Sequence, residues 1–226
     1  MGFLDKLKEA AEKAAERARS GAPGFDPGVF DDELATKTEW GPARAGGASF
    51  GTHRLKRRSP SRLEFAPGFG AYAMGLIFVV AGAGVGIGMT LGGLQGDTSM
   101  IFFGIPFGSI FFVAGIFITL HMTVPSVFDR STERYWRGRK PPATRKGAKG
   151  AVEHCLLQDI HAIQLLSEYC SGSESSFTSY ELNLVLKDAT RLNVVDHGNL
   201  KTIREDGAQL AKYLNVPLWD AIDGTA

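Results

Sequence analysis

The side chains best suited to chemistry in this chain are five histidines and two cysteines. His154 and Cys155 are adjacent, and His161 lies six residues after Cys155. Protein zinc sites use Cys and His pairs at short, regular spacings, and neither CxxC nor HExxH occurs. The sequence therefore predicts no metal-binding residue. Asp196 and His197 have the composition of a catalytic pair, but they fall in a turn before a predicted helix, where aspartate commonly satisfies backbone N–H groups.

The remaining reactive groups are interpreted as structural. A cysteine nucleophile needs a neighbouring base, and Cys155 and Cys170 fall in predicted strands, where cysteine is usually a small buried apolar residue. Glu205 and Asp206 are adjacent carboxylates on the exposed face of a predicted helix. Nucleophile elbow, phosphate-binding loop and kinase motifs do not occur in the sequence. We therefore expect no catalytic residue, no cofactor-binding residue and no enzymatic activity.

Charged and apolar residues occupy separate stretches of the 226-residue chain, although the formal net charge is only +1. Residues 70–122 contain one charged side chain, that of Asp97. Residues 123–150 contain eight Lys/Arg and two Asp/Glu, whereas residues 151–226 contain five Lys/Arg and eleven Asp/Glu. A hydrophobic content of 44% excludes a disordered chain. The segregation is typical of a membrane protein with a basic collar and an acidic domain.

Two apolar segments, residues 69–93 and 99–124, contain no Asp, Glu, Lys or Arg. About 20 helical residues at ~1.5 Å each cover the ~30 Å hydrocarbon core, so each segment is predicted to span a bilayer. The short linker Leu94–Thr98 makes them an antiparallel hairpin and lacks Lys and Arg. Basic residues flank the pair on its outer sides, which places both termini in the cytoplasm. That reducing compartment suits two unpaired thiols.

Glycines recur at four-residue spacing in both segments, and small residues at this spacing let helix backbones approach closely. The candidate helix-packing residues are Gly82, Gly84, Gly86, Gly88, Gly92, Gly104 and Gly108. They serve packing within the hairpin, a homo-oligomer or docking onto a larger membrane complex. No ionisable group lies mid-membrane, where proton relays and ion pathways need one, so a transporter is disfavoured.

The stretch before the hairpin is predicted in three parts. Residues 1–20 form an amphipathic helix that lies on the membrane surface, docks on a partner or is solvated. Residues 21–48 are rich in Gly and Pro and are interpreted as a linker, with Trp40 as an anchoring residue. Residues 49–66 alternate as a β-hairpin, which we expect to pair with the strands after the membrane hairpin into one split β-domain.

The soluble part after the hairpin is predicted as a small antiparallel β-domain. A strand pair covers residues 127–136, and the later strands are expected near 153–157, 161–170, 179–187 and 190–196. Asn199 is expected to cap a helix that ends near Leu214, Asn215 to adopt the left-handed conformation after it, and Leu218 and Trp219 to close the sheet.

Short antiparallel strands closed by one C-terminal amphipathic helix resemble the pleckstrin-homology (PH) superfold. The order of VFDRSTERYW, DIHAIQLLSEY, YELNLVLKDATRLNVVDHG and a closing helix resembles bacterial inner-membrane proteins with a two-helix transmembrane hairpin and a C-terminal cytoplasmic PH-like domain. The resemblance covers the hairpin and residues 127–220. It implies a membrane α+β fold in the bacterial inner membrane, and it implies architecture rather than activity.

The basic loop 137–150 is denser in charge than topology requires. Its candidate contacts to anionic lipid headgroups are Arg137, Arg139, Lys140, Arg145, Lys146 and Lys149, each contributing about 1 kcal/mol near the surface. Residues 151–226 carry a net charge of −6, which suits a basic protein partner. Few aromatic residues interleave with the basic ones, so nucleic acid is not expected as a partner.

The expected function is a membrane-anchored PH-like adaptor or scaffold that binds a protein partner at the cytoplasmic face of the inner membrane. One alternative is an accessory structural subunit of a larger membrane complex, in which the glycine faces make the main contact. Another is an enzyme or transporter whose site lies outside known motifs.

Overall fold

The fold was described from a computed structural model, which covers residues 25–44, 46–142, 153–171 and 176–223. The predicted amphipathic helix at residues 1–20 lies outside the described residues. The chain divides into two compact units. The hairpin unit comprises Thr52–Arg54 and Ala66–Pro125, and the β-unit holds the described residues of the remainder.

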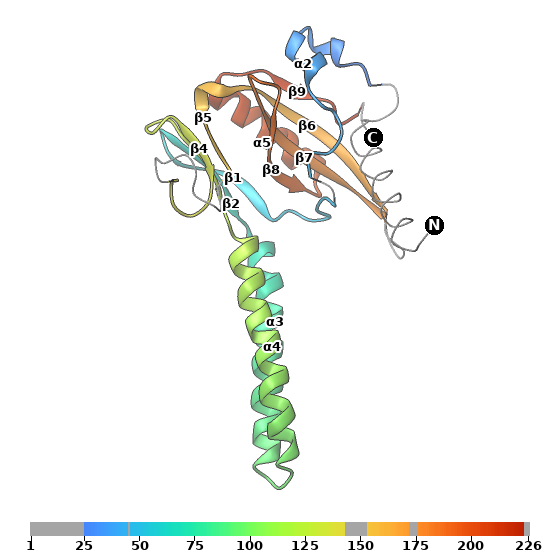
Figure 1. The fold of residues 1–226 in the computed structure, drawn as a ribbon, viewed down its shortest axis with the longest axis vertical. Coiled ribbons are helices and arrows are strands. Elements are labelled where there is room, and N and C mark those ends of the chain that lie inside the picture. The colour runs from blue at the N-terminus through green and yellow to red at the C-terminus, as the bar shows by residue number, and fades with distance from the viewer. Residues whose placement is uncertain (1–24, 45, 143–152, 172–175, 224–226) are drawn as a thin grey trace, which may run out of the picture. The chain divides into compact units, whose positions relative to one another are not determined.

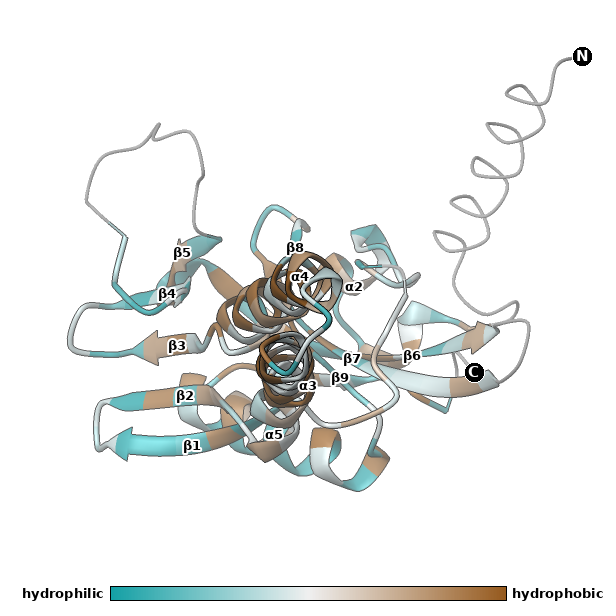
Figure 2. Ribbon diagram, turned by 90° about the horizontal axis from the view of Figure 1, so that it is seen from below, coloured by the Kyte–Doolittle hydropathy of each residue, from teal (hydrophilic) through white to brown (hydrophobic). Residues whose placement is uncertain are grey.

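The hairpin unit is built from α3 (Phe69–Gly93) and α4 (Ser99–Met122), which lie side by side (Figure 1). Both helices are long and apolar enough to cross a membrane by length and composition. Only 11% of the apolar stretch of α3 and 17% of the apolar stretch of α4 is buried, whereas the core helix of a soluble protein is mostly buried. Figure 2 shows apolar residues along both helices.

The first sheet of the fold contains five strands in the order β1-β2-β3-β4-β5. Their bounds are His53–Ser59, Arg62–Pro67, Ser126–Asp129, Arg134–Arg137 and His154–Leu156. The antiparallel pair β2–β3 joins the segments on either side of the hairpin, with Phe65 opposite Ser126. The hairpin is therefore an insertion between two paired strands, and residues 49–66 pair with the later strands as expected.

The second sheet contains four strands in the order β8-β7-β6-β9. Their bounds are Arg191–His197, Ser176–Leu186, Ile160–Ser171 and Leu218–Asp220. A short 3-10 helix, η2 (Leu157–Asp159), precedes β6. β9 pairs parallel to β6, so this sheet is mixed and the prediction of a purely antiparallel domain was wrong in this detail. The physical reason is that α5 carries the chain back across the sheet before β9.

Helix α5 (Leu200–Leu214) has both of its predicted ends. The Asn199 side chain accepts a hydrogen bond from the Thr202 N–H, and Asn215 adopts the left-handed conformation at φ 59°. Its apolar stripe packs on the second sheet, where Gly207 lets the helix approach Leu165 closely. The main core lies under α5 and includes side chains of both sheets: Leu63, Phe65, Phe128, Tyr135, Ile163, Leu165, Leu182, Leu184, Ile203 and Leu210.

The predicted linker 21–48 is an ordered part of the β-unit over its described residues. It contains η1 (Pro27–Phe30) and α2 (Glu33–Lys37), each begun by an aspartate whose side chain accepts a backbone N–H. Trp40 is buried and packs on Trp219 of β9 with 5.7 Å between ring centres. The aromatic residues of this stretch form a second small core, so Trp40 is an anchoring residue as expected, and the stretch packs on the second sheet. We call residues 25–48 the strap.

Candidate functional site

The residues selected for possible metal or nucleophile chemistry do not converge. Burial raises the pKa of the Cys155 thiol to about 12, which opposes formation of a thiolate. His161 pairs with Asp32 of the strap, with 2.7 Å between Nε2 and Oδ2. Within the described part of the chain, no three His, Cys, Asp or Glu residues form a group that could hold a metal ion.

Asp196 and His197 are not arranged as a catalytic pair. Asp196 lies in β8 and accepts a hydrogen bond from the Asn193 amide at 2.9 Å. His197 Nδ1 instead accepts the backbone N–H of Asn199 at 2.9 Å, so this ring helps to begin α5. Both residues lie within β8 rather than in the predicted turn, because the strand runs as far as His197.

The glycines of the hairpin divide into two sets by the direction they face. A Cβ on Gly82 would lie 2.4 Å from the backbone N of Phe112 and 2.6 Å from the oxygen of Gly108. Gly86, Gly104 and Gly108 also face the opposite helix, and Gly92 faces Met100. Four-residue spacing alone missed Gly75 and Gly115, where the helices approach equally closely.

Gly84 and Gly88 differ from these, because a Cβ on either would meet nothing within 4 Å. The prediction that Gly84 and Gly88 pack within the hairpin was therefore wrong. Two residues along a helix turn it by about 200°, so a residue two positions from Gly82 or Gly86 faces away from α4. These two glycines lie on the free surface of α3.

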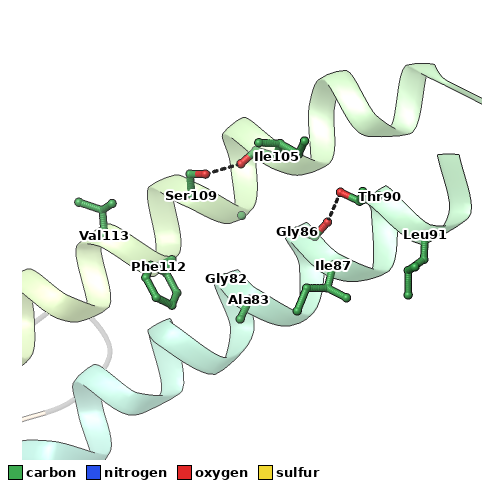
Figure 3. A pocket seen from close by; sticks show the side chains of 11 residues that line it. Gly82, Ala83, Gly86, Ile87, Thr90, Leu91, Ile105, Ser109, Phe112 and Val113 are labelled. Carbon is green, nitrogen blue, oxygen red and sulfur yellow. Dashed lines mark hydrogen bonds between the residues drawn. The ribbon is translucent and has the colours of Figure 1, made fainter. Parts of the chain in front are cut away.

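A groove of about 460 Å³ lies between the two helices (Figure 3). Glycines form part of its lining, and Ile87, Leu91 and Phe112 also contribute. The Thr90 hydroxyl donates to the Gly86 carbonyl at 2.7 Å, and the Ser109 hydroxyl donates to the Ile105 carbonyl at 2.6 Å. Because these hydroxyls bond to their own helices, the groove offers an apolar surface.

The strap is held on the second sheet by polar side chains. Glu181 is 3% exposed, and its carboxylate accepts the backbone N–H groups of Ala43 at 2.9 Å and Arg44 at 3.0 Å. The Asn193 amide donates to the same carboxylate at 2.8 Å. Further contacts along the strap are Gln164 to the Glu39 carbonyl, Arg191 to the Gly41 carbonyl, Glu168 to the Gly46 N–H and Ser179 to the Ala48 N–H. The polar face of this sheet is therefore occupied by the chain itself.

The folding free energy should depend on pH through Glu181. Burial raises the pKa of this carboxyl, while the Ala43 N–H and the Asn193 amide oppose the rise. A raised folded pKa means that stability is highest below the unfolded value, near 4.5, and falls as pH rises through the folded value. We expect Glu181→Gln to flatten this fall in the thermal midpoint measured above pH 4.5. Glu168→Gln makes the same substitution at another strap contact and is the matched control; an equal flattening there would contradict the assignment.

The predicted lipid-contact residues fall into three groups. Arg137 is half-buried, with its Nη1 3.9 Å from a Glu153 oxygen, so it pairs within the β-unit. Arg139 and Lys140 are exposed. Arg145, Lys146 and Lys149 lie outside the described residues. Exposed basic residues on β1 form a further cationic surface.

Comparison of the chain with protein-family models, with curated proteins and with solved structures finds no match. The candidate site is therefore assessed on its geometry alone.

Proposed function

We propose that this chain is a membrane-anchored adaptor, with its hairpin spanning the bacterial inner membrane and its PH-like β-unit and both termini in the cytoplasm. The observation that carries the proposal is the insertion of the α3–α4 hairpin between the paired strands β2 and β3. One residue separates β2 from α3, and three separate α4 from β3. Both ends of an anchor inserted in this way continue into strands of the same sheet, so the anchor holds that sheet at the bilayer through two connections.

The hairpin surface supports an anchor rather than a conduction pathway. Large apolar side chains such as Ile77, Phe102 and Phe117 are more than half exposed, as lipid-facing residues are. The hydroxyl groups that line the groove bond to their own helix backbones. Ion and proton pathways use ionisable groups at membrane depth, whereas α3 and α4 contain no Asp, Glu, Lys or Arg, and the histidine of α4, His121, lies at its end.

The β-unit supports a binding role rather than catalysis. Its buried polar groups hold the strap, and its cysteine and histidine residues are dispersed through the fold. The described residues of 153–223 carry ten Asp/Glu and five Lys/Arg, and acidic groups such as Glu205 and Asp223 are exposed. A basic surface on a protein partner would complement this charge.

The test combines membrane extraction with partner capture. The full chain, expressed at native level, should stay in the membrane pellet after alkaline carbonate washing, and protease added to the cytoplasmic face should reach both termini. Crosslinking in mild detergent followed by mass spectrometry should then link a stoichiometric partner to residues 153–223. Release by carbonate would contradict the anchor, and absence of a stoichiometric partner would contradict the adaptor.

One observation favours a second candidate, the accessory subunit of a larger membrane complex. Gly84 and Gly88 lie on the free side of α3, and small residues at this spacing let another transmembrane helix approach closely. Changing both residues to Leu should release such a complex in mild detergent while leaving the hairpin itself intact. Retention of the complex would contradict this candidate.

A further inference from the structure

Positive charge is concentrated in the strands that flank the hairpin in the sequence. Residues 52–68 and 123–142 contain ten Lys/Arg and three Asp/Glu. The described residues of 153–223 show the reverse balance, with five Lys/Arg and ten Asp/Glu. Figure 2 shows most of β1 as hydrophilic. The first sheet is therefore cationic and the rest of the β-unit is anionic.

Strand alternation assigns these basic residues to opposite faces of the first sheet. Leu55 packs against the core, and the Arg57 guanidinium lies 5.9 Å from the centre of the Tyr213 ring of α5. Lys56 and Arg58, at the alternate positions, are exposed on the opposite face. We call this the outer face, and the strand registers extend it to Arg62, Glu64, Val127, Asp129, Arg134 and Trp136.

The basic groups of the outer face are held by their neighbours on the sheet. Glu64 is only 8% exposed, and its two carboxylate oxygens lie 3.2 Å from Arg58 Nη2 and 3.6 Å from Arg62 Nη2. The Arg62 guanidinium lies 5.5 Å from the centre of the Trp136 ring. One carboxylate and one indole therefore order two guanidinium groups, which reduces the side-chain entropy lost when they bind an anion.

Two N–H donors of this face still need an acceptor. Trp136 is 2% exposed, and neither its Nε1–H nor the Nε–H of Arg62 has a hydrogen-bond partner in the described part of the chain. A buried N–H without an acceptor is unfavourable, and most such groups in folded proteins are paired. Both nitrogens are buried, so the groups of this face that a phosphate can reach are the exposed side chains of Lys56 and Arg58. A phosphate oxygen matches the planar fork of a guanidinium, and the outer face presents this fixed positive charge at its surface.

We propose that the outer face binds the phosphate of anionic phospholipid headgroups. This proposal rests on the membrane anchoring proposed above and names the class of lipid that the β-unit recognises. Arg62 lies seven residues before α3 begins at Phe69, which limits its distance from the span to about 23 Å at ~3.3 Å per strand residue. An acidic polypeptide carries the same charge, but chain position favours the lipid.

The test measures lipid binding to the full chain in nonionic detergent, with native mass spectrometry counting the bound lipid molecules. The probes are phosphatidylglycerol, zwitterionic phosphatidylcholine, inorganic phosphate and polyglutamate. We expect a preference for phosphatidylglycerol that Lys56→Gln/Arg58→Gln weakens about 25-fold, or about fivefold for each charge removed. The control Lys201→Gln/Lys212→Gln removes the same net charge from exposed positions of α5 and should bind like the parent.

Several results would overturn the lipid assignment. An equal loss in the α5 control would show a net-charge effect with no role for the outer face. Inorganic phosphate binding as tightly as phosphatidylglycerol would show a free-anion site, and displacement of the lipid by polyglutamate would show a protein-binding surface. Membrane anchoring is scored separately by carbonate extraction of the same variants, so a correctly anchored chain without lipid preference refutes this proposal alone.

Discussion

Gly82→Leu is expected to separate α3 from α4, because there is no room for a side chain at their contact. A Cβ at this position would lie 2.4 Å from the Phe112 backbone N and 2.6 Å from the Gly108 oxygen. Since these are backbone atoms, a rotamer change cannot relieve the overlap, and the helices must move apart along the contact. Overpacking of this kind typically costs about 1–3 kcal/mol and more when backbones must shift.

The separation of α3 from α4 is measured by crosslinking two cysteines within one chain. Cysteines introduced at Phe78 and Phe111, whose rings stack at 6.1 Å, should crosslink efficiently in the parent and at least tenfold less in Gly82→Leu. Gly84→Leu is the matched control, because the same residue change two positions away meets open space. If the two variants crosslink equally, the helix pairing described for the hairpin is wrong.

The glycines show what spacing reveals and what it leaves open. The sequence shows two overlapping sets with four-residue spacing, and either set alone satisfies the small-residue pattern. Only the direction of the second helix distinguishes Gly82 and Gly86 from Gly84 and Gly88. That direction depends on the packing of α4, including Gly104 and Gly108, and no single-helix pattern contains it.

The soluble elements were predictable where local chemistry decides them. Alternation of Leu182 and Leu184 with polar residues places β7, and the side chain of Asn199 begins α5. The strap was missed because its Gly and Pro residues are typical of a linker, while its contacts lie far away in sequence. Glu181 is 138 residues from Ala43, and such long-range partners leave no local pattern.

The outer face was missed for the same reason as the strap, because it depends on contacts between residues far apart in the sequence. Basic residues before the hairpin satisfy the positive-inside rule wherever they point, so sequence reasoning had no cause to separate Lys56 and Arg58 from Arg57. Pairing of β2 with β3 and of β3 with β4 creates the distinction by bringing Trp136 and Arg62 onto one face. A topology signal and an organised cationic surface are therefore compatible readings of the same residues.

Trp40→Ala should weaken the packing of the strap on the second sheet by about 3–5 kcal/mol, the usual loss for a buried Trp replaced by Ala. The indole is 7% exposed, packs on Trp219 at 5.7 Å and stacks with Phe30 at 5.2 Å, and its N–H donates to the Ala35 carbonyl at 2.8 Å. Truncation leaves a cavity between the strap and the second sheet and removes the hydrogen bond from the indole N–H to the Ala35 carbonyl. The strap should detach before the sheets unfold, because α5 and the main core do not depend on it.

Limited proteolysis of the full chain in detergent distinguishes this order from global unfolding. Trp40→Ala should be cut first within residues 25–48, while fragments containing β6 to β9 survive with the parent's resistance. Trp40→Phe keeps an aromatic ring in the cluster but loses the hydrogen bond and part of the indole volume, so it should lose less stability than Trp40→Ala and resist cleavage better. Simultaneous cleavage of the strap and the sheets in Trp40→Ala would contradict this order of unfolding. It would mean that the strap and the sheets unfold as one cooperative unit.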